Sequence, residues 1–570
     1  MATLARCIGA LCLAFLALPA AVGGANKLEL HPELRSDMSF SSRRRHGLKL
    51  KITETGLAYL RDLGMEAINR RIPELNIPDV TKVVDNGQGV VKIFNNGIAG
   101  YNPPIQHNLD LNLGRGFTWI MDNFEVKADG QFEGLYRVPI LGLVNPSGRY
   151  VVLLQAMSFR LEVNIKASSQ GWPVLEAGRC TTSVPLMDVA IKDSGLVFDI
   201  ALNFLKGIII AKTRPAIEKE LCSTVRKLIN HGVNVILRSM PLSVQLDKPN
   251  MDVFPRRRRK RETRRRHKRA PRSSLPTPDI SDLDVLKKLR RQPFVLDFRL
   301  TESPQFSFGY AVMFHKGEIS WRGRGGTPFG PPEMPNHPPS GSEMVEFYGS
   351  DFLVNSLLYH AYKRQLLDVS INPLSMPNIK NMLKTSCDDG LDFCIGDMIW
   401  ELGDEYPDHF VEIKMRATRA PAVLFREGKA EFNMFGDMFL FVRNPRRRSR
   451  LWVMTVEVDL KAEMTLRFDG QRVGGEIKVK GLNMRLKRSR IPDVDETAFE
   501  DLGFFSSDMV GRMATDMFKS GLPVPTPTGV TLKRPTLTVH ERYILVKTYF
   551  TMDEDEVGSL MDRVNSRTGG

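Results

Sequence analysis

The sequence predicts an α+β protein built from two halves of similar size. In each half an apolar-faced helix, strands with alternating apolar residues and a second long helix follow one another. A basic, Pro/Ser-rich segment near the midpoint separates the halves, and 570 residues exceed the usual size of one domain. The predicted boundaries are 25–250 for the N-terminal half, 251–280 for the linker, 281–550 for the C-terminal half and 551–570 for a tail.

Residues 1–24 have the composition of a secretory signal peptide. One arginine precedes an apolar run from Ile8 to Val22, small residues follow, and cleavage is expected near Gly24 or Ala25. The run is short for a membrane span, and the most apolar later segment, DIALNFLKGIIIA, has only 13 residues. We therefore expect a secreted, extracellular protein.

The linker holds most of the net charge. Residues 256–272 contain twelve Lys or Arg and one acid, so they contribute +11 of the net +15. Two Arg-x-Lys-Arg patterns, which furin-like proteases cut, end at Arg261 and Arg269, and we predict processing there. A block of like charge repels itself and stays exposed. Contact with heparin-like polyanions or acidic lipids is the alternative role, whereas nucleic acid is not expected outside the cell.

In the first half, the stretch 56–75 predicts a helix with one apolar face, ending near Pro73. Alternating apolar residues then predict strands near 89–101, 117–129, 150–167 and 184–200. The stretch 202–240 has mixed helical periodicity and is expected to break or bend around Pro215.

The second half repeats this order. Strands are predicted within 294–321, a helix within 349–365, further strands, a helix within 496–521 and a last strand region. Long twisted antiparallel sheets tend to curl, and helices can cover the opening. A tube with an apolar bore would suit an acyl chain.

Four cysteines remain after removal of the signal peptide, namely Cys180, Cys222, Cys387 and Cys394. Three pairings are open, and the simplest places one disulfide in each half. Zinc is the alternative, but separations of 42 and 7 residues match no zinc signature, so no metal is expected. The chain also has no GxSxG, HExxH, P-loop or dinucleotide motif. We therefore expect neither an enzyme nor a cofactor.

Three stretches carry a family resemblance. They are GLKLKITETGLAYLRDLGMEAINRRIPELNIPDV near the start, GTPFGPPEMPNHPPSGSEMVEFYGSDFLVNSLLYHAYKRQLLDVSI in the second half, and SGLPVPTPTGVTLKRPTLTVHERYILVKTYF near the end. They resemble the family of bactericidal/permeability-increasing protein, lipopolysaccharide-binding protein and lipid transfer proteins, within the tubular lipid-binding superfamily. The separation of Cys180 and Cys222 also matches that of the family's N-terminal disulfide.

The resemblance implies a boomerang of two tubular lipid-binding modules, each a highly twisted antiparallel β-barrel with long helices, joined by a central β-sheet. It implies a secreted protein that sequesters phospholipid or other lipid acyl chains and moves them between membrane or lipoprotein surfaces, without catalytic residues. The alternative is an innate-immune lipopolysaccharide-binding protein. Candidate lipid contacts, for which core packing is the commoner outcome, are Leu57, Leu60, Ile68, Phe204, Ile208 and Ile210 in the first half and Phe352, Leu353, Leu357 and Leu358 in the second.

The charge of the loops at the tip of the N-terminal module distinguishes lipid transfer from lipopolysaccharide binding. Endotoxin-binding relatives carry basic loops there, and the aligned stretches here are 136–150 and 166–179. These two stretches contain only four cations, and Glu176 offsets part of their charge. The low positive charge favours lipid transfer over endotoxin recognition. The four cations are Arg137, Arg149, Lys166 and Arg179. The candidates for a second basic patch, for which a solvated face is the alternative, are Arg43, Arg44, Arg45, Arg70 and Arg71. In the tail, an apolar stripe would form a lid if helical, through Val557, Leu560, Met561 and Val564.

Overall fold

The structure is a computed structural model. It describes residues 30–74, 77, 79–84, 89–138, 142–193, 206–246, 250–251, 289, 291–374, 379–387, 394–444, 449–469, 472–519, 521–524, 526–527 and 529–553. The predicted signal peptide, the processing residues Arg261 and Arg269, Phe204 and the apolar stripe of the tail lie outside the described residues.

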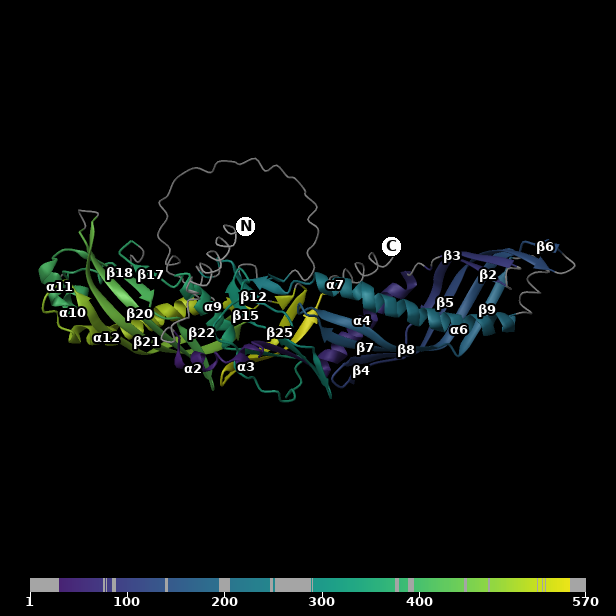
Figure 1. The fold of residues 1–570 in the computed structure, drawn as a ribbon, viewed down its shortest axis with the longest axis horizontal. Coiled ribbons are helices and arrows are strands. Elements are labelled where there is room, and N and C mark those ends of the chain that lie inside the picture. Colours follow the sequence, from purple (N-terminus) through teal and green to yellow (C-terminus); the bar gives the residue numbers. More distant parts are fainter. Residues whose placement is uncertain are drawn as a thin grey trace, which may run out of the picture.

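The molecule is elongated, with one module at each end and shared sheets between them (Figure 1). The N-terminal module is an antiparallel sheet in the order β2-β3-β5-β7-β8, to which β4, β6 and β9 add shorter pairings. Its strands are β2 (Val80–Val84), β3 (Gly89–Asn102), β4 (Gln106–Asn112), β5 (Gly116–Val138), β6 (Gly142–Val144), β7 (Ser147–Ala167), β8 (Pro173–Ser183) and β9 (Leu186–Lys192).

The first long helix, α4 (Glu54–Arg71), confirms the predicted helix. It starts where the Thr53 side chain accepts a hydrogen bond from the amide of Gly56, an N-cap that satisfies one of the free amides of the first turn. It passes into the short 3₁₀ helix η2 (Ile72–Glu74), which contains Pro73.

The second long helix differs from the prediction. α6 (Lys206–Lys227) continues through Pro215 without a break. The irregularity comes later, as a π-helical segment η4 (Leu228–Val233) followed by α7 (Asn234–Ser239). Ile217 and Leu221, which follow Pro215, pack against the buried cluster of the N-terminal sheet, and tertiary packing can override the low helix propensity of a proline.

The C-terminal module is a second antiparallel sheet, ordered β17-β18-β20-β21-β22-β23, with β19 also paired to β20. Helix α12 (Thr497–Lys519) lies along β22. Ile395 of the short helix α10 (Ile395–Met398), Leu402 of α11 (Trp400–Glu405) and Ile399 between these two helices belong to the core of the module. The strands are β17 (Val369–Ile371), β18 (Phe410–Ala417), β19 (Ala422–Arg426), β20 (Lys429–Arg443), β21 (Arg450–Asp469), β22 (Arg472–Ser489) and β23 (Leu522–Pro523).

The sheets between the modules mix strands from both halves of the chain. The largest is ordered β13-β14-β1-β16-β26-β25, so β1 (Leu48–Thr53) of the first half lies between two strands of the second. The other strands are β13 (Gln305–Ser307), β14 (Tyr310–His315), β16 (Val345–Ser350), β25 (Val530–His540) and β26 (Tyr543–Met552). Two smaller sheets also cross the halves: β10 (Ser243–Gln245) pairs with β12 (Phe294–Asp297), which pairs with β15 (Glu318–Trp321), and β11 (Asn250–Met251) pairs with β24 (Thr526–Pro527).

Two buried lysines of β1 attach the Pro-rich segment 326–342 to the central sheet. Lys49 donates to the carbonyl oxygen of Pro335 at 2.9 Å, and Lys51 donates to that of His337. Both lysine side chains lie against the ring of Tyr348. Burial lowers the pKa of Lys49 to about 8, and the carbonyl oxygens that accept from its ammonium group offset part of the cost of burying that charge.

Residues 30–45, placed by sequence in the N-terminal half, pack against the C-terminal half. We call this segment the N-terminal arm; it contains α2 (Pro32–Ser36) and α3 (Phe40–Arg43). Leu30 and Leu34 are buried with Phe329 and with Phe352 of α9 (Phe352–Lys363). No pattern in the sequence indicated this contact.

Proteolytic cleavage after Arg261 or Arg269 is expected to leave the two halves bound to each other. The pairing of β1 with β14 and β16 and the docked arm hold them together, although each disulfide lies within one half. Size-exclusion chromatography of cleaved protein should show one species of unchanged size, which separates into two fragments only in concentrated urea. Elution of two fragments from native buffer would contradict this prediction.

Candidate lipid-binding site

The inner face of the N-terminal sheet is apolar along its length. Residues directly opposite on neighbouring antiparallel strands point to the same side of a sheet, and Trp119, Leu161 and Cys180 are opposite one another on β5, β7 and β8. A buried cluster continues this face, made of Phe124, Leu154, Met157, Phe159, Leu161, Val163 and Val184. Half-buried apolar side chains border it, Phe117, Met121 and Val126 among them.

Helix α4 covers Trp119. A Cβ atom on Gly64 would lie 3.2 Å from the Trp119 ring, so the helix backbone approaches the ring closely. Leu57, Leu60 and Ile68 share the helix face of Gly64, at i−7, i−4 and i+4, and all three are half-buried. The structure thus places these three predicted lipid contacts over the inner face.

Helix α6 covers the same face nearer β8. Its side chains Ile217, Leu221 and Val225, with Ile229 of η4, pack against the inner cluster. The sequence analysis missed these four residues, although their spacing of four marks one helix face. Of the residues it named, Ile210 is half-buried in α6, Ile208 lies in α6 with a side chain outside the described set, and Phe204 precedes the described helix.

Polar contacts and a disulfide attach the continuous helical segment α6, η4 and α7 to β8, an edge strand. Asn234 is buried; its Oδ1 accepts from the amide of Leu175 at 2.9 Å, and its Nδ2 donates to the carbonyl of Leu175 at 2.7 Å. Asn230 accepts from the amide of Ala177, and the disulfide Cys180–Cys222 joins α6 to the same strand. Three backbone groups of this edge strand are thus satisfied by asparagine side chains of η4 and α7.

Two tyrosine hydroxyls within the N-terminal module are paired with asparagine side chains, whereas the indole Nε1 of Trp119 is buried without a hydrogen-bond partner. The hydroxyl of Tyr101 donates to Asn69 of α4 at 2.9 Å, and burial raises the pKa of Tyr101 to about 12. The hydroxyl of Tyr150 donates to Asn96, and burial also raises its pKa. Neutral hydroxyls at these positions favour uncharged, apolar ligand groups beside them.

The four candidate contacts on α9 do not share one pocket. Phe352 packs against Leu30 and Phe329. Leu353 and Leu357 pack against a cluster around Phe294, and Leu358 packs against another around Val423. All four contact protein core, so their role in binding lipid stays a prediction.

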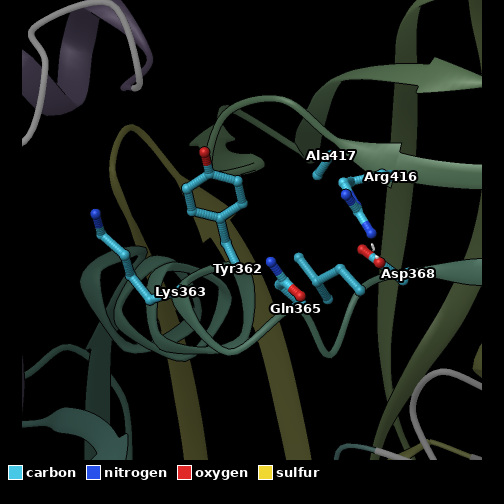
Figure 2. A pocket seen from close by; sticks show the side chains of 7 residues that line it. Tyr362, Lys363, Gln365, Asp368, Arg416 and Ala417 are labelled. Atoms are coloured by element: carbon cyan, nitrogen blue, oxygen red, sulfur yellow. Dashed lines mark hydrogen bonds and ion pairs between the residues drawn. The ribbon is translucent and has the colours of Figure 1, made fainter.

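A small pocket lies at the C-terminal end of α9, beside β18 (Figure 2). It has a volume of about 230 Å³ and is lined by Tyr362, Lys363, Gln365, Leu367, Asp368, Arg416 and Ala417. Arg416 forms an ion pair with Asp368 at 3.1 Å across it. Ligand pockets for small molecules usually measure about 300–1,000 Å³, so this polar pocket is too small for a two-chain lipid.

Comparison with known protein families finds a match for each half of the chain. Residues 56–239 match the N-terminal domain of the LBP / BPI / CETP family, and residues 288–552 match its C-terminal domain.

The chain belongs to the LBP / BPI / CETP family. It is 21% identical over 509 residues to lipopolysaccharide-binding protein of Homo sapiens, covering 88% of this chain and 92% of that protein. It is 20% identical to bactericidal permeability-increasing protein of Sebastes schlegelii, covering 88% and 94%. A crystal structure of lipopolysaccharide binding protein matches with a TM-score of 0.48 and 17% identity, covering 89% of this chain and 99% of that one.

In this member of the LBP / BPI / CETP family, an exposed apolar row crosses the far end of the N-terminal module. Val83, Val90 and Leu135 are directly opposite one another on β2, β3 and β5, and Leu143 of β6 is opposite Arg137 on the same face. Their exposed fractions are 68%, 39%, 44% and 59% for Val83, Val90, Leu135 and Leu143. Figure 1 shows β6 at the end farthest from the central sheets.

The predicted tip alignment was right for 136–150 and wrong for 166–179. The second stretch forms the turn between β7 and β8, where the amide of Leu300 donates to the carbonyl of Gly171, close to the central sheets. A strand of 21 residues such as β7 extends roughly 70 Å at about 3.3 Å per residue. Its two ends therefore cannot share a tip.

Two of the four cations that the sequence analysis considered for the tip form ion pairs. Arg149 forms an ion pair with Asp193 at 2.6 Å, and Lys166, near the central sheets, pairs with Glu176 at 2.6 Å. Three of the arginines considered for a second patch have partners of their own. Arg43 donates to the carbonyl oxygen of Pro328, Arg45 pairs with Glu333, and Arg70 pairs with Glu66 on α4.

Both disulfides are present in the structure, Cys180–Cys222 and Cys387–Cys394. Cys387, Cys394 and Asp397 lie close together in the described part of the chain, but both thiols are consumed by the disulfide. Among the described helices, none combines the length and the apolar character needed to cross a membrane.

Proposed function

We propose that this protein is a secreted lipid-binding protein that holds acyl chains against the inner face of its N-terminal module and transfers them between lipid surfaces. The observation that supports this most is the continuous apolar face of β5, β7 and β8 beneath α4 and α6, with half-buried side chains along it. Each methylene removed from water contributes about 0.8 kcal/mol. A chain lying along this face would gain affinity without any charged contact.

The N-terminal module is favoured over the C-terminal one for cargo. In the C-terminal module, the candidate residues of α9 are already packed into three protein cores, and the pocket beside them is small and polar. Side chains that fill a protein core have little surface left for a ligand.

The exposed row of Val83, Val90, Leu135 and Leu143 supports docking on a membrane or lipoprotein surface during transfer. Exposed apolar rows on a sheet are uncommon on soluble proteins and mark interaction surfaces. Arg137 on the same face is exposed and suits the phosphate groups of a phospholipid layer.

Lipopolysaccharide binding is the second candidate, and the names of the relatives favour it. Lipid A needs charge-assisted contacts to its phosphates. The pairing of Arg149 with Asp193 and of Lys92 with Glu133 leaves less free positive charge at the described part of the tip. We therefore place phospholipid or another lipid of low charge first.

Replacing Leu60 and Ile68 together by aspartate is expected to lower the amount of bound lipid at least about tenfold, because a charge buried against an apolar chain costs several kcal/mol. The measurement is native mass spectrometry of protein secreted from eukaryotic cells, with lipid extraction to identify the cargo. Leu186→Asp is the matched control, since Leu186 is 58% exposed on β9 and opposite Gln155 on the outer face.

Two outcomes would contradict the proposal. Equal lipid content in the double variant and the wild type, at similar melting temperatures, would remove the inner face of the N-terminal module as the binding site. Wild-type protein that carries no lipid but captures added lipopolysaccharide would favour the second candidate instead.

A further inference from the structure

The far end of the C-terminal module is strongly acidic. Residues 395–408 carry five acidic side chains and residues 491–511 carry six, and neither stretch contains a lysine, arginine or histidine. The two stretches meet in space, because the amide of Asp495 donates to Oε1 of Glu401 at 2.7 Å. Figure 1 shows their helices α10, α11 and α12 at the end of the molecule opposite β6. We call these two stretches the acidic end.

Helix α12 presents one exposed face at the acidic end. Its other face is packed, since a Cβ atom on Gly503 would lie 2.2 Å from the carbonyl oxygen of Leu482 on β22, and Phe499 is fully buried in the core. The exposed face, which we call the α12 face, combines two rings with three carboxylates at spacings of four residues: Glu500, Asp501, Phe504, Phe505 and Asp508. Phe504 is 77% exposed, Phe505 is 64% exposed, and their rings contact each other edge to face. Adjacent exposed rings of this size indicate an interaction surface.

The carboxylates of the α12 face lack counter-ions in the described part of the chain. Glu500, Asp501 and Asp508 form no ion pair with a described lysine or arginine. Deeper in the acidic end, the side chain of Glu401 is buried, with 6% of the residue exposed, and its Oε2 has no hydrogen-bond partner among the described groups. A buried carboxylate with an unused oxygen is costly. A positive charge brought close to this end would therefore stabilise it.

This combination selects a cationic ligand rich in arginine. Anionic lipids and polyanions are repelled by the acidic end, and a purely apolar ligand would have to take carboxylates out of water. Guanidinium groups bind carboxylates through paired hydrogen bonds and also stack on aromatic rings. An arginine-rich chain can thus use both parts of the α12 face.

The protein itself contains such a ligand. Residues 256–272 hold ten arginines and two lysines and lie outside the described residues. The described chain before them ends at Met251, which pairs with Pro527, eight residues after α12 ends at Lys519. Fully extended, the segment 256–272 would span roughly 56 Å, whereas the 23 residues of α12 extend about 34 Å. The basic segment is therefore long enough to follow the whole helix.

We propose that the basic segment 256–272 docks on the α12 face of its own chain. Exposed ion pairs are individually weak, but a tethered segment has an effective concentration of about millimolar at its site. Docking would hold the +11 charge of the linker against the acidic end and bring Arg261 and Arg269, the predicted cleavage sites, next to folded protein. This inference does not depend on lipid binding, because it uses the module opposite the proposed lipid site.

The first test measures binding of a synthetic peptide with the sequence of residues 255–272. Fluorescence anisotropy at low ionic strength would compare two full-length proteins, the wild type and a chain with a neutral linker, in which residues 256–272 are replaced by Gly and Ser. In the chain with the neutral linker, the face variant combines Glu500→Gln, Asp501→Asn and Asp508→Asn.

The matched control, also in the chain with the neutral linker, neutralises three exposed acids of the N-terminal module. It combines Asp79→Asn, Asp110→Asn and Asp129→Asn and so changes the net charge as much as the face variant does.

The chain with the neutral linker should bind the peptide at least about tenfold more tightly than the wild type, whose own segment occupies the α12 face. The face variant should bind the peptide at least about tenfold more weakly than its parent, and the control should differ from that parent less than about twofold. Melting temperature and lipid content by native mass spectrometry should be unchanged in the face variant, which separates this inference from the proposed lipid function.

The second test locates the segment in the intact wild type. A carbodiimide joins lysine amines directly to carboxylates, and Lys260 and Lys268 are the two lysines of the segment. In a mixture of unlabelled and ¹⁵N-labelled chains, mass spectrometry should find these lysines joined to residues 497–511 of the same chain.

Three results would overturn the inference. The first is equal affinity of the peptide for the wild type and for the chain with the neutral linker. The second is a face variant that binds the peptide as tightly as its parent. The third is cross-linking mainly between an unlabelled and a labelled chain, which would assign the α12 face to the linker of a second copy.

Discussion

Replacing Arg542 by methionine is expected to lower the free energy of unfolding by about 3–5 kcal/mol, because it leaves a buried carboxylate without its counter-ion. Arg542 donates through Nε to Asp351 at 2.6 Å and through Nη2 to Asp37 at 2.7 Å. The side chain of Asp351 is fully buried, and Asp37 belongs to the N-terminal arm. Urea denaturation at pH 7 would measure the loss, and hydrogen exchange in residues 30–45 would show whether the arm detaches.

The pH dependence gives this prediction a second readout. Burial raises the pKa of Asp351 to about 6 even with Arg542 beside it, against an ordinary value of 3.8. A carboxyl group with a raised pKa in the folded state binds its proton more tightly there than when unfolded, so its contribution to stability falls as pH rises from about 4 to about 6. Without Arg542 the ionised form becomes still less favourable, so the deficit of Arg542→Met should shrink between pH 7 and pH 5.

The control is the double variant Asp351→Asn with Arg542→Met, which removes both charges. It should recover part of the lost stability at pH 7, because no unpaired buried carboxylate remains at position 351. A deficit of equal size in the single and double variants, with no dependence on pH, would show that Arg542 acts through packing alone.

Replacing Asn234 by leucine is expected to lower the free energy of unfolding by about 2–5 kcal/mol. Asn234 satisfies both the amide and the carbonyl of Leu175 on the edge strand β8, and each buried backbone group left without a partner costs about 1–3 kcal/mol. Thermal or urea denaturation would measure the change, and hydrogen exchange should report loss of protection in β8.

Asn230→Ala is the matched control for this variant, because Asn230 is exposed and makes a single bond to β8, with the amide of Ala177. It should cost about 1 kcal/mol or less. If both variants lose the same small amount of stability, the buried Asn234 does not anchor the helix.

In the C-terminal half, a buried asparagine of a different helix also pairs with the backbone of an edge strand. Asn355 of α9 is buried and exchanges two hydrogen bonds of 2.8 Å with the backbone of Val423 on the edge strand β19. In each half, one asparagine of a helix thus pairs with one residue of an edge strand and covers an edge that is otherwise open to pairing.

The sequence by itself determined the local elements and the family. The apolar spacing over 56–75 and 496–521 predicted helices that the structure has at Glu54–Arg71 and Thr497–Lys519. Alternation predicted the long strands of the first half, and the separations of the four cysteines were consistent with the two disulfides observed. These features depend on the period of a helix or a strand and on short stretches of chain, so a single sequence shows them.

Only the tertiary structure decided how distant segments combine. The sequence of β1 does not reveal that it lies between β14 and β16, nor that the arm packs on Phe329 and Phe352. The turn 166–179 was assigned to the wrong end of the module because a loop's residues do not encode the length and direction of the strand before it. The apolar side chains of α9 have one helical pattern yet contact three separate cores, since spacing shows which faces of a helix are apolar but not what packs against each of them.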